Sequence, residues 1–155
     1  MELKKLHEAL EEILDNIVSL LEDENGKAKE LGLKVQIVRG DRSRPAPRPP
    51  TVWVRGMPAV PDHTQRTYAE KWTLPILLLG MIQNTDPEKG YKEATELAAR
   101  ARSIVLGDRT LNNRAFVQDV RSGRFEMSGP ATQRDDLFAA TAMVDVVFVI
   151  LERNP

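Results

Sequence analysis

Apolar residues recur at helical spacing in two segments of this 155-residue chain. In residues 2–22, leucine, isoleucine and valine return every three or four positions, which indicates a long amphipathic helix. Residues 87–106 show the same period after a helix-start signal, with Asp86 or Thr85 as the cap and Pro87 in the first turn. Gly107 is expected to end this second helix. Its predicted buried stripe is Tyr91, Ala94, Leu97, Ala98, Ala101, Ile104 and Val105.

Alternating apolar and polar positions predict extended segments in the rest of the chain. Short strands are expected at 33–39 and 51–54, and long strands at 68–82 and 137–151. Pro75 lies inside the first long strand, which predicts an edge position or a bulge there. The apolar face of the last strand consists of Phe138, Ala140, Ala142, Val144, Val146, Phe148 and Ile150.

One further extended segment is expected at 114–128, between the second helix and the last strand. Ser122 and Gly123 in its middle predict a turn.

The elements predict an α/β fold of the α+β type, with residues 1–155 forming a single domain. Its sheet is expected to be mainly antiparallel, with four or five strands, and the two helices should pack against it. Strands of about 15 residues would span roughly 50 Å, whereas a globule of this length has a radius of gyration near 15 Å. The long strands are also apolar on both faces, so both sides of the sheet should be covered, by the helices and by a neighbouring subunit.

The net charge of −1 conceals an uneven distribution. Residues 1–30 carry nine acidic residues against four lysines, whereas residues 39–55 carry five arginines against one aspartate. There is no cysteine, which excludes disulfides and cysteine-based metal centres. The apolar runs are shorter than the roughly 20 residues of a membrane span, so no membrane partner is predicted and the chain is expected to be made in a cytoplasm.

Candidates for catalysis are few and isolated. His7 is expected on the first helix beside its apolar stripe, and His63 lies in a loop beside Asp62. Asp135 and Asp136 fit a metal-binding or acid pair, and a loop that ends in the start of a strand explains them as well. No nucleophile, metal-binding or phosphate-binding motif is present. The sequence therefore predicts no enzyme, no cofactor and no metal.

The stretch "RGDRSRPAPRPP" raises a different possibility, that of a contact with another protein. Prolines leave the loop at 40–50 stiff and short of backbone donors, and arginines suit carboxylates or phosphates. We expect this arm to contact the acidic helix of a neighbouring subunit, or another protein. Trp53 follows on a short strand, whereas Tyr68 and Trp72 are expected in the core. The predicted interface residues are Arg39, Arg42, Arg44, Arg48, Arg55 and Trp53.

The order of parts resembles the tail terminator, or tail-completion, proteins of long-tailed bacteriophages, which are minor tail or neck proteins. The resemblance runs through "LHEALEEILDNIVSLL", "TVWVRG", "YAEKWTLPILLLGMI", "GYKEATELAARARSIVLGD" and "RAFVQDVRSGRF". It implies a virion structural protein, made in the host cytoplasm, that forms a homo-oligomeric ring with a hexamer expected. The ring would end the tail tube and join it to the head-neck. The implied partners are further copies of the chain, the major tail-tube protein and the head-neck connector protein. DNA would pass through the channel without specific binding.

Three alternatives remain open at this point. The chain fits a head-closure or neck connector protein, since these have similar small α/β folds. It also fits an intracellular binding module whose "RPAPRPP" docks on a proline-recognition domain. A small α/β enzyme would instead gather His63 with carboxylates in a pocket. The mass of the oligomer, measured in solution and in the presence of tail-tube protein, separates a ring-forming structural protein from the binding module and from the enzyme.

Overall fold

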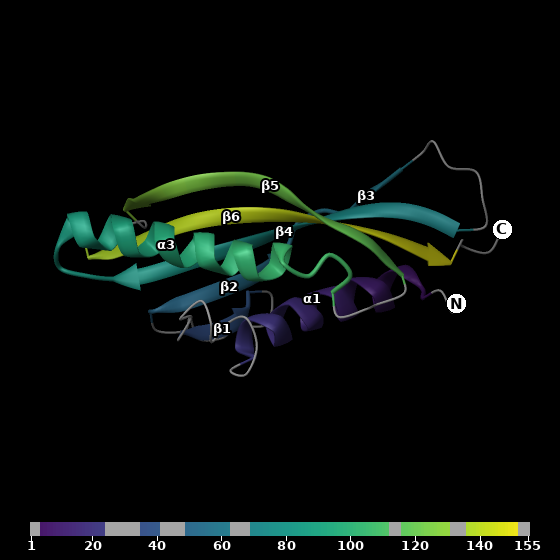
Figure 1. Ribbon diagram of the computed structural model, residues 1–155, viewed down its shortest axis with the longest axis horizontal. Helices are drawn as coiled ribbons and strands as arrows, with labels where there is room; N and C mark the ends of the chain where they lie inside the picture. Colours follow the sequence, from purple (N-terminus) through teal and green to yellow (C-terminus); the bar gives the residue numbers. More distant parts are fainter. Residues whose placement is uncertain are drawn as a thin grey trace.

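The computed structural model describes residues 4–23, 35–40, 49–62, 69–111, 116–130 and 136–151. Within these residues the chain forms two helices and six strands (Figure 1). The helices are α1 (Leu6–Glu22) and α3 (Pro87–Leu106). The strands are β1 (Gln36–Arg39), β2 (Thr51–Gly56), β3 (Val60–Pro61), β4 (Ala69–Gln83), β5 (Val117–Pro130) and β6 (Leu137–Leu151).

The strands form one sheet in the order β1-β2-β4-β6-β5, and β3 pairs with β4 beyond the end of β2. β4 and β6 pair along their whole length, from Ala69 opposite Leu151 to Gln83 opposite Leu137. Only the β1–β2 pair is parallel among these strands. The predicted α+β fold with a mainly antiparallel sheet is confirmed, although the sheet has six strands rather than four or five.

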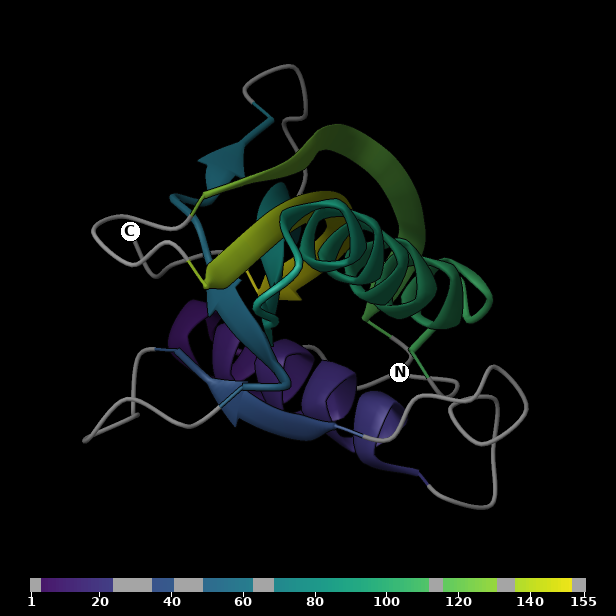
Figure 2. The same ribbon diagram turned by 90° about the vertical axis from the view of Figure 1, so that its left-hand side faces the viewer.

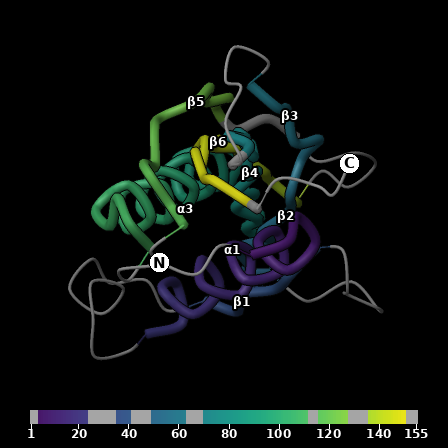
Figure 3. Tube along the Cα trace, turned by 90° about the vertical axis from the view of Figure 1, so that its right-hand side faces the viewer, coloured from purple at the N-terminus to yellow at the C-terminus, as the bar shows by residue number. Residues whose placement is uncertain are grey.

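Both helices lie on the same side of the sheet. Viewed from one end, the sheet curls around them, and α1 and α3 occupy its concave side (Figure 2, Figure 3). Alternate residues in the middle of β4 point to that side and are buried, as Leu74, Ile76 and Leu78 are. The predicted apolar face of β6 is the concave face, and all seven of its residues are buried. No described helix covers the convex side.

Helix α3 begins and ends where the sequence predicts. The Asp86 carboxylate accepts a hydrogen bond from the Glu88 amide at 3.1 Å, which caps the helix, and Pro87 occupies the first position. At the other end the Gly107 amide donates to the Ser103 carbonyl at 3.0 Å. The predicted buried stripe is confirmed except at Tyr91, which is 39% exposed.

Gly90 takes the buried position in place of Tyr91. A side chain at Gly90 would overlap the ring of Phe138, whose edge lies against the helix backbone there. The Tyr91 ring packs edge-on against the same phenylalanine, with 4.8 Å between ring centroids. The N-terminal end of α3 is thus held to β6 by Phe138.

Helix α1 ends at Glu22, as predicted, and begins at Leu6 rather than at residue 2. Residues 1–3 lie outside the described part of the chain. The helix buries Ile13, Ile17 and Leu21 against the sheet, which is the stripe that the leucine and isoleucine spacing indicated.

Pro75 does not place β4 at an edge, because β4 pairs with β6 on one side and with β2 and β3 on the other. The Pro75 carbonyl accepts from the Met57 amide at 2.8 Å, so the imide nitrogen of Pro75 also faces the β2–β3 side. There β2 ends opposite Ile76 and β3 begins opposite Thr73. The missing donor of Pro75 therefore falls in the gap between two short strands, where no ladder bond is lost.

The turn predicted near Ser122 and Gly123 is wrong. These residues lie within β5, which continues from Val117 to Pro130 along β6. The pairing register shifts between Ser122 and Phe125, which is typical of a β-bulge. Gly123 fits this place because an added Cβ would lie 2.9 Å from the Met143 carbonyl oxygen. The short strand β3 was not predicted.

Gly80 sets the distance between β4 and α3. A Cβ at this position would lie 3.0 Å from the Ala98 amide nitrogen and 3.3 Å from the Ala94 carbonyl oxygen. These are backbone atoms, so the helix itself must move to admit a methyl group. We expect Gly80→Ala to lower the free energy of unfolding by roughly 1–3 kcal/mol, measured by urea denaturation.

Gly56→Ala is the matched control for this substitution. Gly56 also lies in a strand, but its nearest foreign atom, the Leu14 Cδ1, would be 3.5 Å from an added Cβ, which is ordinary contact. The control should stay within about 0.5 kcal/mol of the wild type. Equal unfolding midpoints for the two variants would show that α3 does not pack closely on Gly80.

Candidate assembly surface

Arg39 connects the first edge of the sheet to helix α1. It is the last residue of β1, and its side chain points to the concave side with that of its partner Val54. Glu11 and Asp15 stand one helical turn apart on α1 and face it together. Arg39 Nη1 donates to Glu11 Oε2 and to Asp15 Oδ1, each at 2.9 Å. The arginine side chain is 7% exposed, and the two carboxylates are 51% and 60% exposed.

Arg39 therefore has a different role from the one predicted for the interface arginines. It was expected to act with the basic loop on a neighbouring subunit, but its guanidinium is occupied by the acidic helix of its own chain. Arg42, Arg44 and Arg48 lie outside the described residues. Their role as interface residues stays a prediction.

The remaining predicted interface residues, Trp53 and Arg55, lie together on β2. Both point to the convex side, opposite Leu79 and Leu77 of β4. Gly40, at the root of the Pro/Arg loop, packs beside them, since an added Cβ there would lie 3.2 Å from the Trp53 ring and 3.6 Å from Arg55 Cβ. Within the described part of the chain, the Trp53 Nε1 is buried without a hydrogen-bond partner. The root of the loop and these two residues thus form one corner of the convex face.

The convex face of the sheet is largely apolar. Most of its apolar positions are half-buried, and Leu137 and Val147 are buried. Val60 on β3 is 58% exposed. The apolar side chains of this face are Val38, Trp53, Val60, Pro75, Leu77, Leu79, Met81, Leu137, Ala139, Met143, Val147 and Val149.

A shallow pocket of about 120 Å3 lies near the middle of the convex face. Its lining comes from three adjacent strands, with Leu77 on β4, Thr141 and Met143 on β6, and Arg124 and Glu126 on β5. Small-molecule sites generally measure about 300–1,000 Å3. The pocket is smaller than that range.

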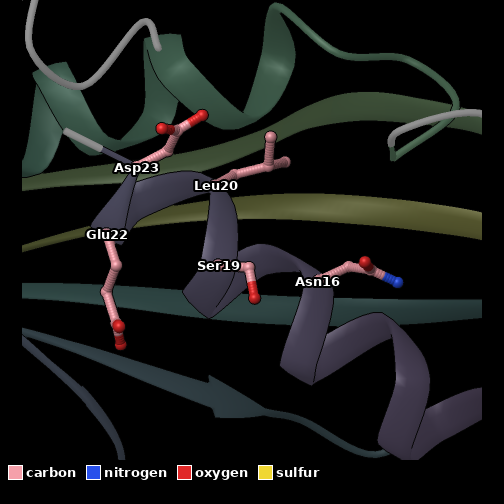
Figure 4. A pocket seen from close by; sticks show the side chains of 5 residues that line it. All are labelled: Asn16, Ser19, Leu20, Glu22 and Asp23. Carbon is pink, nitrogen blue, oxygen red and sulfur yellow. The ribbon is translucent and has the colours of Figure 1, made fainter. Parts of the chain in front are cut away.

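A second hollow, of about 450 Å3, lies beside the C-terminal half of α1. Its described lining is one leucine, Leu20, and four polar residues, Asn16, Ser19, Glu22 and Asp23. Figure 4 shows these side chains pointing in different directions, with Glu22 directed away from Leu20 and Asp23. They do not converge on a point where a reacting atom would sit.

The isolated candidates for catalysis are placed as follows. His7 is exposed on α1, and His63 and Asp135 lie outside the described residues. Asp136 has a structural position, since its carboxylate accepts from Gln83 Nε2 at 2.8 Å and its carbonyl from the Asn84 amide at 2.9 Å. Among the described residues no group of histidine and acidic side chains is arranged to hold a metal ion.

Tyr68 and Trp72 are predicted to lie in the core, and the structure describes Trp72. Trp72 packs against the core, and its Nε1 donates to Glu70 Oε2 at 3.1 Å. Tyr68 lies outside the described residues. In the described helices no stretch has the length and apolar character that crossing a membrane requires.

The edge strand β5 carries an ion pair on its exposed side. Arg121 Nε donates to Asp119 Oδ2 at 3.2 Å, and this bond is the main cause that lowers the pKa of the Asp119 carboxyl below its ordinary value. The Val120 amide donates to the same carboxylate at 2.9 Å and acts in the same direction. Charged side chains and register shifts along an edge strand disfavour the addition of another strand there.

No family model and no curated protein sequence matches the chain. Among solved structures it is similar to a chain of the virion of a native gene transfer agent (GTA) particle, with a TM-score of 0.50. The match covers 86% of this chain and 91% of that chain at 9% sequence identity. At such identity the likeness concerns the fold, and no residue role follows from it.

The Arg39 ion pairs should contribute to the stability of the folded chain. Glu11→Gln combined with Asp15→Asn removes both carboxylate partners of a buried guanidinium, and we expect a loss of roughly 1–3 kcal/mol. This is at the low end of values for buried pairs, because the carboxylates are half exposed. Chemical denaturation measures the loss.

The control is the double variant Glu8→Gln, Glu22→Gln, which removes two exposed charges from the same helix. It should change stability by less than about 0.5 kcal/mol. A loss of the same size in both double variants would mean that Arg39 gains nothing from its carboxylate partners.

Proposed function

We propose that this protein is a structural component of a phage-like virion, and that it acts as a tail terminator. In this role it forms a homo-oligomeric ring that ends the tail tube and joins it to the head-neck. The observation that carries the proposal is the likeness of fold, over nearly the whole of both chains, to a chain of a gene transfer agent virion. The order of elements through which the sequence resembles tail terminators adds independent support.

The described surface suits an assembly role. A broad apolar sheet face is costly to leave in water, and large exposed apolar patches commonly mark interaction sites. The convex face carries half-buried apolar side chains of β1, β2, β4 and β6 and the exposed Val60 of β3. The proposal assigns no catalytic step to any residue and no cofactor.

The partners follow from the proposed place in the particle. They are further copies of the chain, the major tail-tube protein and the head-neck connector, while DNA passes through the channel without specific binding. The loop arginines would hold a neighbouring subunit or the tube rather than DNA, because strong phosphate contacts would retard DNA that must move. The protein would be located in the tail or neck of the virion.

Measurements of the oligomeric state and of binding to tail tubes test this function. Purified protein should form closed rings, visible by negative-stain electron microscopy, with a mass that is a multiple of 17.4 kDa in native mass spectrometry. The rings should bind the end of tail tubes assembled from the matching tube protein. Rings that bind only the head connector would make the chain a head-closure protein, and a monomer that binds neither would refute the proposal.

The loop arginines should strengthen the assembly. Replacing Arg42, Arg44 and Arg48 by Ser removes three positive charges from the loop, so the fraction of assembled protein should fall at equal concentration. Exposed ion pairs weaken with ionic strength, so the wild type should lose its advantage over the variant as salt is raised.

The matched control replaces three exposed positive charges of α3, Lys89, Lys92 and Arg100, by Ser. This variant has the same change in net charge and should assemble like the wild type. Normal rings from the loop variant would show that the loop is only a connector.

A further inference from the structure

The chain is held from both faces of the sheet at the point where the Pro/Arg loop begins. On the concave side, the Arg39 guanidinium donates to Glu11 and Asp15 of α1, each at 2.9 Å. On the convex side, the Gly40 backbone passes so close to Trp53 that an added Cβ would lie 3.2 Å from its ring. Two consecutive residues are thus fixed by different elements, immediately before Asp41 in the sequence.

Strand β1 alone would hold this point weakly. It has four residues, and within the described sheet its hydrogen-bonded neighbour is β2, on one side only. The Gly40 amide adds one bond to that pair, since it donates to the Val54 carbonyl at 2.9 Å. The ends of short strands at a sheet edge are among the parts of a fold that open most easily. The ion pairs of Arg39 with α1 oppose such opening at the last residue of the strand.

The burial of Arg39 separates its role from that of an interface residue. Its side chain is 7% exposed, so the guanidinium is not presented to another molecule, whereas Arg55 on β2 is exposed. An effect of Arg39 on assembly must therefore pass through the residues that it holds. Those residues are the end of β1 and the start of the loop.

We propose that Arg39 is a positioning residue for assembly, and that its ion pairs with α1 fix the point from which the Pro/Arg loop leaves the sheet. This rests on the proposed function, in which the loop arginines hold a neighbouring subunit or the tube. A contact made from a fixed starting point loses less conformational entropy on binding than one made from a freely moving segment. The proposal does not depend on which of the two partners the loop contacts.

The variant Arg39→Met tests this role, because it removes the charge and keeps a long apolar stem. The protein concentration at which half of the chain is assembled should rise roughly two- to tenfold, as expected when one more group must be ordered on binding. Analytical ultracentrifugation measures this concentration. Arg39→Lys keeps a positive charge between the two carboxylates and should restore most of the assembly.

The direction of the change distinguishes positioning from direct attraction. Arg39→Met removes the arginine that offsets Glu11 and Asp15, so it makes the middle of α1 more acidic. If those carboxylates attracted a basic partner themselves, the variant would assemble more tightly than the wild type. Positioning predicts the opposite sign.

Two controls separate positioning from a general loss of stability. Gly80→Ala is expected to weaken the fold through the packing of α3 and leaves the Arg39 ion pairs in place, so it should assemble like the wild type. The second control adds Arg39→Met to the variant in which Arg42, Arg44 and Arg48 are replaced by Ser. There it should have no further effect, since a residue that acts through the loop cannot act once the loop contact is lost. Circular dichroism confirms that each variant is folded at the temperature used.

The outcomes decide as follows. Weaker assembly of Arg39→Met, restored by Arg39→Lys and absent in the loop variant, supports the inference. Unchanged or tighter assembly overturns it, as does equal weakening by Gly80→Ala, a full effect in the loop variant, or normal rings from the loop variant alone. In all these cases wild-type rings that bind tail tubes leave the proposed function standing. A wild-type chain that stays monomeric overturns the proposed function and this inference with it.

Discussion

The antiparallel pairing of β4 with β6 is the interaction on which the rest of the fold depends. The two strands match residue for residue over their whole length, and each also supplies the edge on which another strand builds, β2 and β3 on β4 and β5 on β6. A slip of one residue would turn every side chain of a strand to the opposite face. It would place Leu77 and Leu79 against α3 and move Gly80 away from Ala94 and Ala98. The close approach of the helix at Gly80 therefore helps to fix the register.

The same pairing explains why one face of the sheet has no helix over it among the described residues. A 15-residue strand that is apolar on both sides needs two layers of cover, and this chain places both described helices in one layer. The concave side is filled by large side chains such as Phe138 and Phe148. The convex side has half-buried apolar side chains interrupted by Thr73, Thr141 and Asp145.

Local signals in the sequence were sufficient for much of the fold. The cap at Asp86, Pro87 and the end at Gly107 define α3 through contacts within a few residues, and the strict alternation defines β6. The predictions at Pro75 and Gly123 were wrong because contacts with residues distant in the sequence decide the structure there. Pro75 is tolerated in a central strand because two separate strands meet opposite it, and Gly123 belongs to a bulge because Met143 lies beneath it. The pattern of apolar residues along one segment does not reveal which distant residues will pack against it.

Part of the candidate surface could be predicted from residues that are close in the sequence, and the part that depends on distant residues could not. Trp53 and Arg55 were chosen because they follow the basic loop, and the structure places both beside Gly40 at a corner of the convex face. The contact of Arg39 with Glu11 and Asp15 joins residues 28 and 24 positions apart, and the charge pattern alone assigned these partners to different subunits.

The ion pairs of Arg39 give the acidic helix α1 a role within its own chain. Arg39 neutralises part of the middle of α1 within the chain, and it does so from the last residue before the loop. The ion pairs thereby anchor the root of the loop to the helix, with Gly40 held against Trp53 on the other side of β1. Glu8, Glu22 and Asp23 remain exposed toward the two ends of α1. In the proposed assembly, a basic partner would meet exposed carboxylates toward the ends of the helix, away from the pair that holds Arg39 at its centre.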